Sequence, residues 1–274
     1  GKTTTLLMLV TLKPPTSGTA TINGFDIVKQ ADKVRKSIGI VFQDPSSDEI
    51  LTGYENLKLH GWLYDMPSDL REERIKEVLE LVELTDRRND RVKKYSGGMR
   101  RRLELARGLM HHPKILFLDE PTLGLDPQSR EHIWKYIENL AKEKNMTIVL
   151  TTHYMDEAER CSRVALMSEG RILALDEPNA LRAAFPDDLL ELLAEPQETA
   201  VQIAAADAGV RDVQVFGERL HIRVPRGSGD AAAARLSAAC SQAGVRITSV
   251  RAVPASLEDV FIDRVAATPE QSAV

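Results

Sequence analysis

The sequence has only two cysteines, and it has no apolar run of the length that a membrane-spanning helix requires. Cys161 and Cys240 share no close spacing with each other or with the histidines, so neither a disulfide framework nor a zinc site is predicted. The longest apolar runs, such as 115–118 and 148–150, fall far short of the roughly 20 residues that a span needs. We therefore expect a protein of a reducing, cytosolic compartment with no membrane span of its own.

Aromatic residues are scarce at 5%, and neither sign of charge dominates. The 36 basic and 41 acidic residues give a formal net charge of -5, which argues against a protein coated by nucleic acid but leaves room for a local basic patch. A composition of 43% hydrophobic and 28% charged residues is typical of globular proteins. The length of 274 residues predicts one large domain or two unequal ones.

Strand and helix patterns alternate over residues 1–180. Short apolar runs typical of buried strands occur at 38–42, 115–118 and 147–150, and a helical segment separates the last two. This alternation predicts an α/β domain with a parallel sheet. Between about 51 and 110 the apolar residues recur with a period of 3.6, which predicts a helical subdomain.

The composition shifts after Pro178, and a second domain is predicted over 186–267. Its order of strand, helix, strand, strand, helix, strand matches a small α+β ferredoxin-like domain.

Asn23-Gly24 and Glu169-Gly170 each predict a two-residue hairpin turn within the first 180 residues. Residues 268–274 are expected to form a frayed polar tail.

The chain opens on Gly1-Lys2-Thr3-Thr4, which matches the end of the phosphate-binding loop pattern G-x-x-x-x-G-K-[ST]. In that pattern backbone amides and a lysine surround the phosphates, and the hydroxyl reaches Mg²⁺. Taken alone, these residues are equally compatible with a simple helix cap. Because the pattern normally lies inside a domain and the first residue is not Met, we expect the chain to lack its native N-terminus.

Two adjacent carboxylates, Asp119 and Glu120, follow the buried strand at 115–118. This position suits the ligand crevice of an open α/β sheet, where an acid of P-loop enzymes holds Mg²⁺. Glu120 is placed to deprotonate or orient a water that attacks the γ-phosphate. The alternative is that the pair only caps the next helix through Pro121.

A second anion site is predicted at Tyr95-Ser96-Gly97-Gly98-Met99, which precedes three arginines and an apolar helix. Glycines after a serine at a helix start expose amides and a positive dipole end. A protein with one phosphate loop seldom needs two such sites in one pocket, so this one is expected to serve the nucleotide of a second copy. A merely flexible helix entry is the alternative.

Several short motifs follow one another along the first 180 residues: Gly1-Lys2-Thr3-Thr4, Gln43 after Ile40-Val41-Phe42, Tyr95-Ser96-Gly97-Gly98-Met99, Leu118-Asp119-Glu120-Pro121-Thr122, Gly124-Leu125-Asp126-Pro127 and Thr151-Thr152-His153. Together they resemble the ordered motif set of the ATP-binding subunits of ABC transporters. The chain departs from that family in having no strand before the phosphate loop, no adenine-stacking aromatic, and Tyr95 and Met99 in place of the more common leucine and glutamine.

The resemblance implies how ATP and Mg²⁺ are bound. The phosphates would be held by Gly1, Lys2, Thr3 and Thr4, with Lys2 on the β- and γ-phosphates. The Mg²⁺ ion would be held by Thr3, Gln43 and Asp119. An α/β P-loop fold of the ABC ATPase type is the implied architecture of residues 1–180.

The resemblance also implies the catalytic and dimer contacts. Glu120 would be the general base, and His153 would contact the γ-phosphate and help to hold the attacking water, although a single histidine after a strand is more often structural. ATP bound to a second copy would meet Ser96, Gly97 and Gly98. Asp126 would lie across the seam of this ATP-sandwich dimer.

Two surfaces bear on partners. The basic run at 87–102 is compatible with a nucleic-acid patch, but the lack of interleaved aromatic residues favours a solvated face near the bound nucleotide, so no nucleic-acid partner is expected. Residues 46–57 resemble the family surface that receives a short helix of the membrane subunit.

Near the end of the chain, 256–261 is similar to the C-terminal extension of exporter ATPases of the daunorubicin/doxorubicin-resistance type. The resemblance implies an ATPase that powers export of a drug or other molecule through a separate integral membrane permease, as a peripheral protein at the cytoplasmic face of the cell membrane. An importer ATPase, a soluble ABC-type ATPase acting on nucleic acid or ribosomes, and an inactive structural relative are the alternatives.

Overall fold

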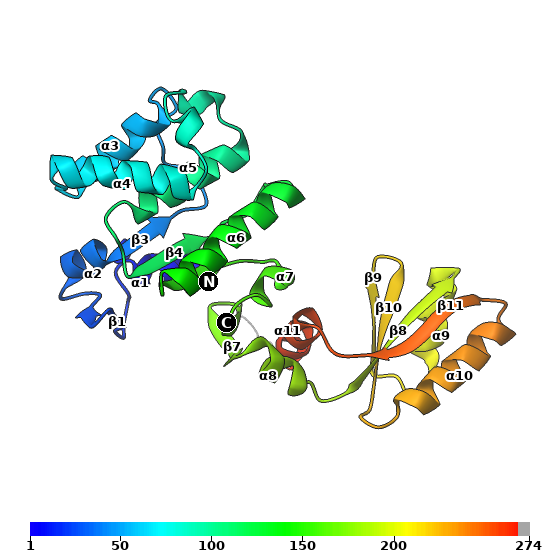
Figure 1. Cartoon of the computed structure of the whole chain (residues 1–274). Helices are drawn as coiled ribbons and strands as arrows, with labels where there is room; N and C mark the ends of the chain where they lie inside the picture. Colours follow the sequence, from blue (N-terminus) through cyan, green and yellow to red (C-terminus); the bar gives the residue numbers. More distant parts are fainter. Residues whose placement is uncertain (268–274) are drawn as a thin grey trace. The chain divides into compact units, whose positions relative to one another are not determined.

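The structure is a computed structural model that describes residues 1–267, except for the side chain of Glu143 (Figure 1). The predicted tail at 268–274 lies outside the described residues. The chain divides into two compact units, one over Gly1–His153 and one beginning at Tyr154, and each is described by itself. The domain boundary expected between 180 and 186 stays a prediction.

A parallel three-stranded sheet forms the centre of the first unit. The strands run in the order β3 (Ile38–Val41), β4 (Ile115–Asp119), β5 (Thr147–Thr151), with β4 in the middle. The apolar residues 116–118 of β4 are at most 1% exposed, which explains the purely apolar run in the sequence. No strand within the described part of the chain pairs with the outer edge of β5, where Val149 is 38% exposed.

Helices and a hairpin accompany this sheet. The helices are α1 (Lys2–Leu9), α2 (Ala31–Ser37) and α6 (Pro127–Glu143), and the hairpin joins β1 (Thr21–Ile22) to β2 (Phe25–Asp26). Asn23 and Gly24 have φ values of 51° and 81°, the left-handed pair that a tight hairpin turn of this kind requires, so the predicted turn is confirmed. Leu6, Val34 and Phe117 pack together and attach α1 and α2 to the sheet.

The helical subdomain expected between 51 and 110 is present. It consists of α3 (Gly53–Leu63), α4 (Ser68–Leu81) and α5 (Gly97–Leu109), with the short 3₁₀ turns η1 (Thr85–Arg87) and η2 (Val92–Lys94) between α4 and α5. Thr52 and Glu55 form a reciprocal capping box that starts α3. Ile75, Val78 and Leu79 of α4 are buried, as the 3.6-residue period predicts.

The second unit begins with α7 (Met155–Ala158) and the antiparallel pair β6 (Val164–Ser168) and β7 (Arg171–Asp176). Glu169 and Gly170, with φ values of 48° and 79°, make the predicted turn between these strands. The helices α8 (Pro178–Ala183) and α11 (Leu257–Ala266) follow, and side chains from both helices share a core with β6. A second capping box, Ser256 with Asp259, starts α11, a helix that the sequence patterns did not predict.

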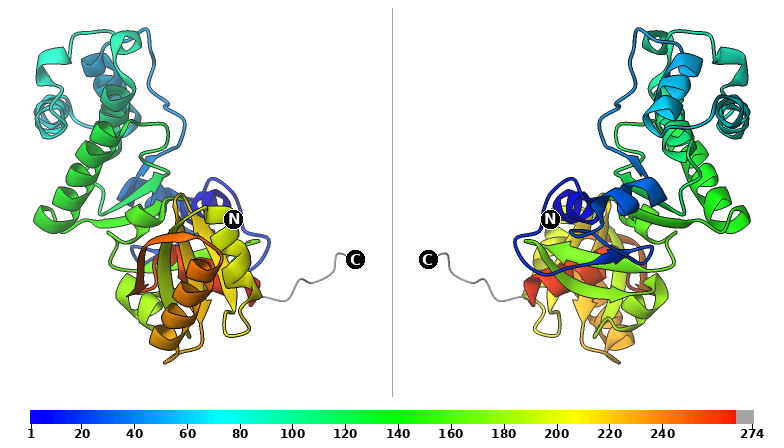
Figure 2. Two further views of the ribbon diagram at one scale, coloured as in Figure 1. Left: turned by 90° about the vertical axis from the view of Figure 1, so that its right-hand side faces the viewer. Right: turned by 90° about the vertical axis from the view of Figure 1, so that its left-hand side faces the viewer.

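The remaining residues confirm the ferredoxin-like prediction. The elements are β8 (Asp188–Glu195), α9 (Gln197–Ala206), β9 (Asp212–Phe216), β10 (Arg219–Val224), α10 (Gly229–Gln242) and β11 (Arg246–Val253). The sheet is antiparallel throughout, in the order β11-β8-β10-β9. The helices α9 and α10 lie side by side on one face (Figure 2), where Leu192, Ile222 and Leu236 are completely buried.

No helix found among residues 1–267 is long and apolar enough to cross a membrane.

Candidate nucleotide-binding and catalytic site

Asp119 is the centre of the first group of predicted site residues. It ends β4, pairs in register with Thr151 at the end of β5, and is 2% exposed. The Thr3 hydroxyl of α1 donates to Asp119 Oδ1 over 3.2 Å, and the Thr151 hydroxyl donates to the same oxygen over 2.5 Å. The structure therefore brings together two of the predicted metal ligands, 116 positions apart in the chain.

The residues of this group fit Mg²⁺. A hydroxyl, an amide oxygen and a carboxylate are hard oxygen donors, and Mg²⁺ is usually bound by one or two such side chains together with substrate phosphates and water. Gln43 follows β3 by two residues, and the β3–β4 register places it at the same sheet edge as Asp119. No cluster of three or more His, Cys, Asp or Glu that could hold a metal is found in residues 1–267.

The phosphate-loop residues begin α1. Gly1 is the residue before the helix, and Lys2, Thr3 and Thr4 form its first turn, where no acidic side chain is present. The first amides of a helix have no intrahelical acceptor and point along the positive end of the dipole. The start of α1 therefore presents a lysine and amide donors beside Asp119, an arrangement suited to phosphate oxygens.

Glu120 and His153, the two predicted catalytic residues, contact each other. His153 Nδ1 lies 2.8 Å from Glu120 Oε2, and the Glu120 side chain is 15% exposed. The backbone of Glu120 is left-handed, with φ of 48°, and its amide donates to the carbonyl of Thr151 over 3.1 Å and to the Thr151 hydroxyl over 3.2 Å. Thr151 therefore contacts both acidic residues: its hydroxyl donates to the Asp119 carboxylate, and its hydroxyl and carbonyl both accept the backbone amide of Glu120.

The signature loop, residues 95–99, starts α5. Ser96 Oγ accepts the Met99 amide over 3.2 Å and caps the helix. Gly98 lies so close to α6 that a Cβ there would be 2.9 Å from Ser129 Oγ, whereas a Cβ on Gly97 would meet nothing nearer than 3.7 Å. Tyr95 is buried and its hydroxyl donates to the Arg87 carbonyl, which gives it a structural role.

Asp126 lies near the signature loop and forms a second group of predicted site residues with it. It caps α6 by accepting the Ser129 amide over 3.0 Å, and hydrogen bonds from the side chain and backbone of Ser129 hold the pKa of Asp126 below its ordinary value. Ser129 thus contacts Asp126 and lies against Gly98. The predicted residues form two groups, one around Asp119 and one around Ser129.

Sequence reasoning missed two residues of the site, Thr151 as a ligand-fixing hydroxyl and Arg101 as a buried cation. Arg101 is 6% exposed and donates to three backbone carbonyls, so the expectation of a solvated face for the basic run is wrong at this position. Burial lowers the pKa of Arg101 to about 10. A sequence signal for the burial of Arg101 was present, because Arg101 shares a helical face with Leu105 and Leu109, both of which are buried.

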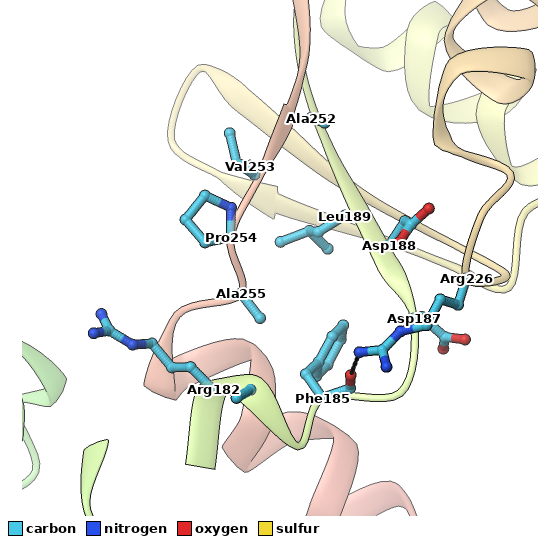
Figure 3. A pocket seen from close by; sticks show the side chains of 11 residues that line it. Arg182, Phe185, Asp187, Asp188, Leu189, Arg226, Ala252, Val253, Pro254 and Ala255 are labelled. Atoms are coloured by element: carbon cyan, nitrogen blue, oxygen red, sulfur yellow. Dashed lines mark hydrogen bonds between the residues drawn. The ribbon is translucent and has the colours of Figure 1, made fainter. Parts of the chain in front are cut away.

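A cavity of about 310 Å³ lies in the second unit, and none of the predicted site residues lines it (Figure 3). Its apolar side is formed by Phe185, Leu189 and Pro254, and Arg226 at its rim donates to the Phe185 carbonyl over 2.8 Å. The predicted residues of the first group lie instead at the carboxyl ends of β3, β4 and β5 and at the start of α1.

A parallel sheet that ends in a lysine-bearing helix start, a buried aspartate and a glutamate–histidine pair, together with a separate Ser-Gly-Gly helix start, defines an ATP-binding cassette ATPase. Comparisons with known proteins agree. Residues 1–123 match the family described as ABC transporter. Residues 177–265 match the family described as ATP-binding protein DrrA1-3-like, C-terminal domain.

Three relatives illustrate the similarity over whole chains. Daunorubicin resistance ATP-binding protein DrrA2 of Streptomyces coeruleorubidus is 36% identical over 96% of this chain and 82% of its own. Linearmycin resistance ATP-binding protein LnrL of Bacillus subtilis is 34% identical over 96% and 85%. Nod factor export ATP-binding protein I of Cupriavidus pinatubonensis is 37% identical over 96% and 78%.

Solved structures show the same fold. A dimeric ATP-binding cassette in a post-hydrolysis state with ADP and Pi is 29% identical, with a TM-score of 0.58 over 65% of this chain and 80% of that one. The cbiO1 subunit from Clostridium perfringens is 28% identical, with a TM-score of 0.62 over 75% and 79%. The chain belongs to the ATP-binding subunits of ABC transporters, within the branch that carries the DrrA-like C-terminal domain. Its expected fold, ATP binding, ATPase activity and export function are thereby confirmed.

Proposed function

We propose that this chain binds ATP with Mg²⁺ between α1 and the ends of β3 and β4, hydrolyses it with Glu120 as general base, and thereby drives a separate membrane permease. The observation that carries the proposal is the Thr3–Asp119 hydrogen bond beside the Glu120–His153 contact. These residues come from three segments of the chain, so their meeting at one sheet edge is a product of the fold.

Each residue of the first group has a distinct task in binding. Lys2 and the first amides of α1 bind the phosphates, and Thr3, Gln43 and Asp119 hold Mg²⁺. When bound, the ion neutralises charge on the β- and γ-phosphate oxygens. The Thr151 hydroxyl keeps the Asp119 carboxylate in one orientation, which reduces the reorganisation needed when the nucleotide enters.

Glu120 acts on the attacking water. Its carboxylate accepts a proton from, or orients, the water that reaches the γ-phosphate. With Nδ1 directed at Glu120, the His153 ring is held in one orientation next to the reacting group. His153 thereby positions the water and contacts the γ-phosphate.

We infer that the working unit is an ATP-sandwich dimer. The signature residues Ser96, Gly97 and Gly98 begin the 13-residue helix α5 and belong to the group around Ser129, not to the group around Asp119. An exposed helix start of this kind is suited to the γ-phosphate of ATP on a second copy. Asp126, at the neighbouring helix start, lies next to this surface. The dimeric cassette of similar fold supports the inference.

The proposed permease contact lies on residues 46–57 and the exposed side of α3. Ile50 and Trp62 are 72% and 54% exposed, an apolar surface suited to a short helix of a membrane subunit. Through this contact the chain would lie at the cytoplasmic face of the membrane. The cargo would be a drug or other small molecule, in line with the daunorubicin and linearmycin resistance of relatives.

The replacement of Glu120 by Gln tests the catalytic assignment. We expect Glu120→Gln to abolish ATP turnover while an ATP-bound dimer accumulates, measured by phosphate release and by sedimentation with ATP. Lys2→Ala is the matched control, because it should prevent both turnover and dimer formation. A Glu120→Gln variant that hydrolyses ATP at the normal rate would remove Glu120 from the mechanism.

The partner assignment is tested by purifying the protein from detergent-solubilised native membranes. We expect a stoichiometric multi-span membrane protein to accompany it, and Ile50→Asp or Trp62→Asp to weaken that association. These positions are better probes than Glu49 or Glu55, because Glu49 pairs with Arg100 and Glu55 caps α3. Recovery with ribosomes or DNA alone would support a soluble ABC-type ATPase instead.

A further inference from the structure

We propose that Arg101 is a positioning residue for ATP hydrolysis, whose guanidinium joins the signature helix α5 to the loop of Gln43 and to the Asp119–Glu120 pair. The inference rests on the proposed function, because it concerns the same site. Arg101 is not among the residues that we assign to phosphate binding, Mg²⁺ binding or general-base catalysis.

The contacts of Arg101 are all with backbone carbonyls of segments that carry predicted site residues. Arg101 Nε donates to the carbonyl of Pro121 over 2.6 Å, and Nη2 donates to the carbonyl of Asp119 over 3.2 Å. Nη1 donates to the carbonyl of Phe42, the residue directly before Gln43. One side chain thus joins the ends of β3 and β4 to the turn that follows Glu120.

The planar fork of an arginine is suited to this task, because its several N–H groups point in fixed directions and bind several acceptors at once. A lysine ammonium at the same place would be a point charge that cannot reproduce all three directions. Among the described residues no carboxylate forms an ion pair with Arg101; its direct partners are carbonyls, and the nearby charges of Glu104 and Asp119 stabilise the guanidinium without contacting it. Burying a guanidinium in this way is costly, and an apolar side chain would serve packing alone better.

Arg101 also lies one helical turn after the signature residues. Gly97 and Gly98 form the first turn of α5, and Arg101 follows Gly97 by four residues on the same helix. A helix transmits a displacement of its first turn to the next without bending appreciably. The position of the Gln43 loop and of Glu120 is therefore set relative to the surface that we assign to the second copy's ATP.

Arg74 of α4 provides a matched control. It is also 6% exposed, and it donates to the carbonyls of Met110 and Leu109 over 3.2 and 2.7 Å, at the opposite end of α5. Replacing Arg74 removes a buried arginine of α4 and its hydrogen bonds to carbonyls at the end of α5. Leu109 and Met110 lie at the far end of α5 from the signature residues, and the other partner of Arg74 is Glu77 in its own helix, so Arg74 contacts none of the predicted site residues.

The experiment compares Arg101→Met, Arg101→Lys and Arg74→Met by thermal melting, amide hydrogen exchange and ATPase kinetics as a function of Mg²⁺. We expect Arg101→Met and Arg74→Met to lose similar thermal stability. Only Arg101→Met should accelerate amide hydrogen exchange of residues 42–46 and 119–122, by about tenfold or more. Its turnover per folded molecule should fall by about 100-fold and the Mg²⁺ concentration for half-activation should rise. Arg101→Lys should give the same pattern to a smaller extent.

The proposal is overturned if exchange in these two segments and the Mg²⁺ dependence stay as in the wild type, or if Arg74→Met changes them equally. If Arg101→Met does not fold, Arg101→Lys decides by the same readouts. An inactive Glu120→Gln variant with normal Arg101 variants would leave the proposed function intact and refute only the role of Arg101. A fully active Glu120→Gln variant would refute both.

Discussion

Gly98 of the signature loop lies against Ser129 of α6, so that a Cβ on residue 98 would come within 2.9 Å of the serine hydroxyl oxygen. The contact ties the start of α5 to the start of α6, where Asp126 is the cap. A side chain at position 98 would therefore force Ser129 to move, independently of any nucleotide.

We expect Gly98→Ala to lower stability by about 1–3 kcal/mol through overpacking and to reduce ATPase activity. Gly97→Ala is the matched control, because its Cβ would meet only Leu125 at 3.7 Å. Thermal melting of both variants checks the difference, and Ser129→Gly should restore stability to Gly98→Ala. Equal melting temperatures for the two alanine variants would contradict the steric argument.

Thr151→Val should reduce ATP turnover by roughly tenfold, because it removes the hydroxyl that donates to Asp119 and accepts the Glu120 amide. Thr151→Ser retains the hydroxyl and should keep most of the activity. Steady-state phosphate release at saturating ATP, with circular dichroism to verify folding, provides the measurement. Normal turnover by the valine variant would show that Asp119 and Glu120 do not depend on this hydroxyl.

His60 makes the helical subdomain sensitive to acid. Burial, together with nearby Arg107 and His111, lowers the pKa of His60 to about 3, and neither ring nitrogen has a hydrogen-bond partner within residues 1–267. An unfolded histidine has a pKa near 6.5, so between about pH 6.5 and 3 the unfolded chain binds a proton that the folded chain excludes. The contribution of His60 to stability is therefore fully present above pH 6.5 and is lost as the pH falls toward 3.

His60→Phe should remove this contribution. Between pH 7.5 and 5 we expect the wild type to lose about 2 kcal/mol more stability than the variant. Urea denaturation at both pH values provides the comparison, and the variant controls for the carboxylates that both proteins share. Parallel losses in the two proteins would mean that His60 stays hydrated or gains a partner in the folded state.

Leu192→Ala should destabilise the ferredoxin-like module by about 2–5 kcal/mol, because the side chain is completely buried at the centre of β8. Leu193→Ala is the matched control, since Leu193 is the next residue on the opposite face of the same strand and is only partly buried. Chemical denaturation monitored by circular dichroism should separate the two variants. A smaller effect for Leu192 than for Leu193 would contradict the assignment of the core face.

Helices, strands and turns with strong local sequence patterns could be predicted from the sequence. Site residues could be predicted where they lie within a recognisable motif. The Asn23-Gly24 turn, the apolar run before Asp119 and the 3.6-residue period of α4 are short-range signals, and the structure confirms each of them. The order of strands and helices in the ferredoxin-like domain was predicted from local patterns of the same kind, and the structure confirms it. The roles of Gln43 and His153 are implied only by the resemblance to the ATP-binding subunits of ABC transporters, and no local pattern predicts them.

Residues whose role depends on distant partners were missed. In the sequence Thr151 is only the first residue of a motif, because its bond to Asp119 depends on the pairing of β4 with β5. The neighbouring arginines predict a solvated face for Arg101. Its burial depends on carbonyls 18 to 59 positions away, which no local pattern contains.

The outer edge of β9 has a consequence for handling the protein. No strand among residues 1–267 pairs with that edge, so β9 presents a row of backbone donors and acceptors, and Val215 on the same strand is 54% exposed. Such an edge templates strand addition from another chain. Self-association that grows with concentration, and that a lysine at position 215 suppresses, is therefore the behaviour to anticipate when this chain is concentrated.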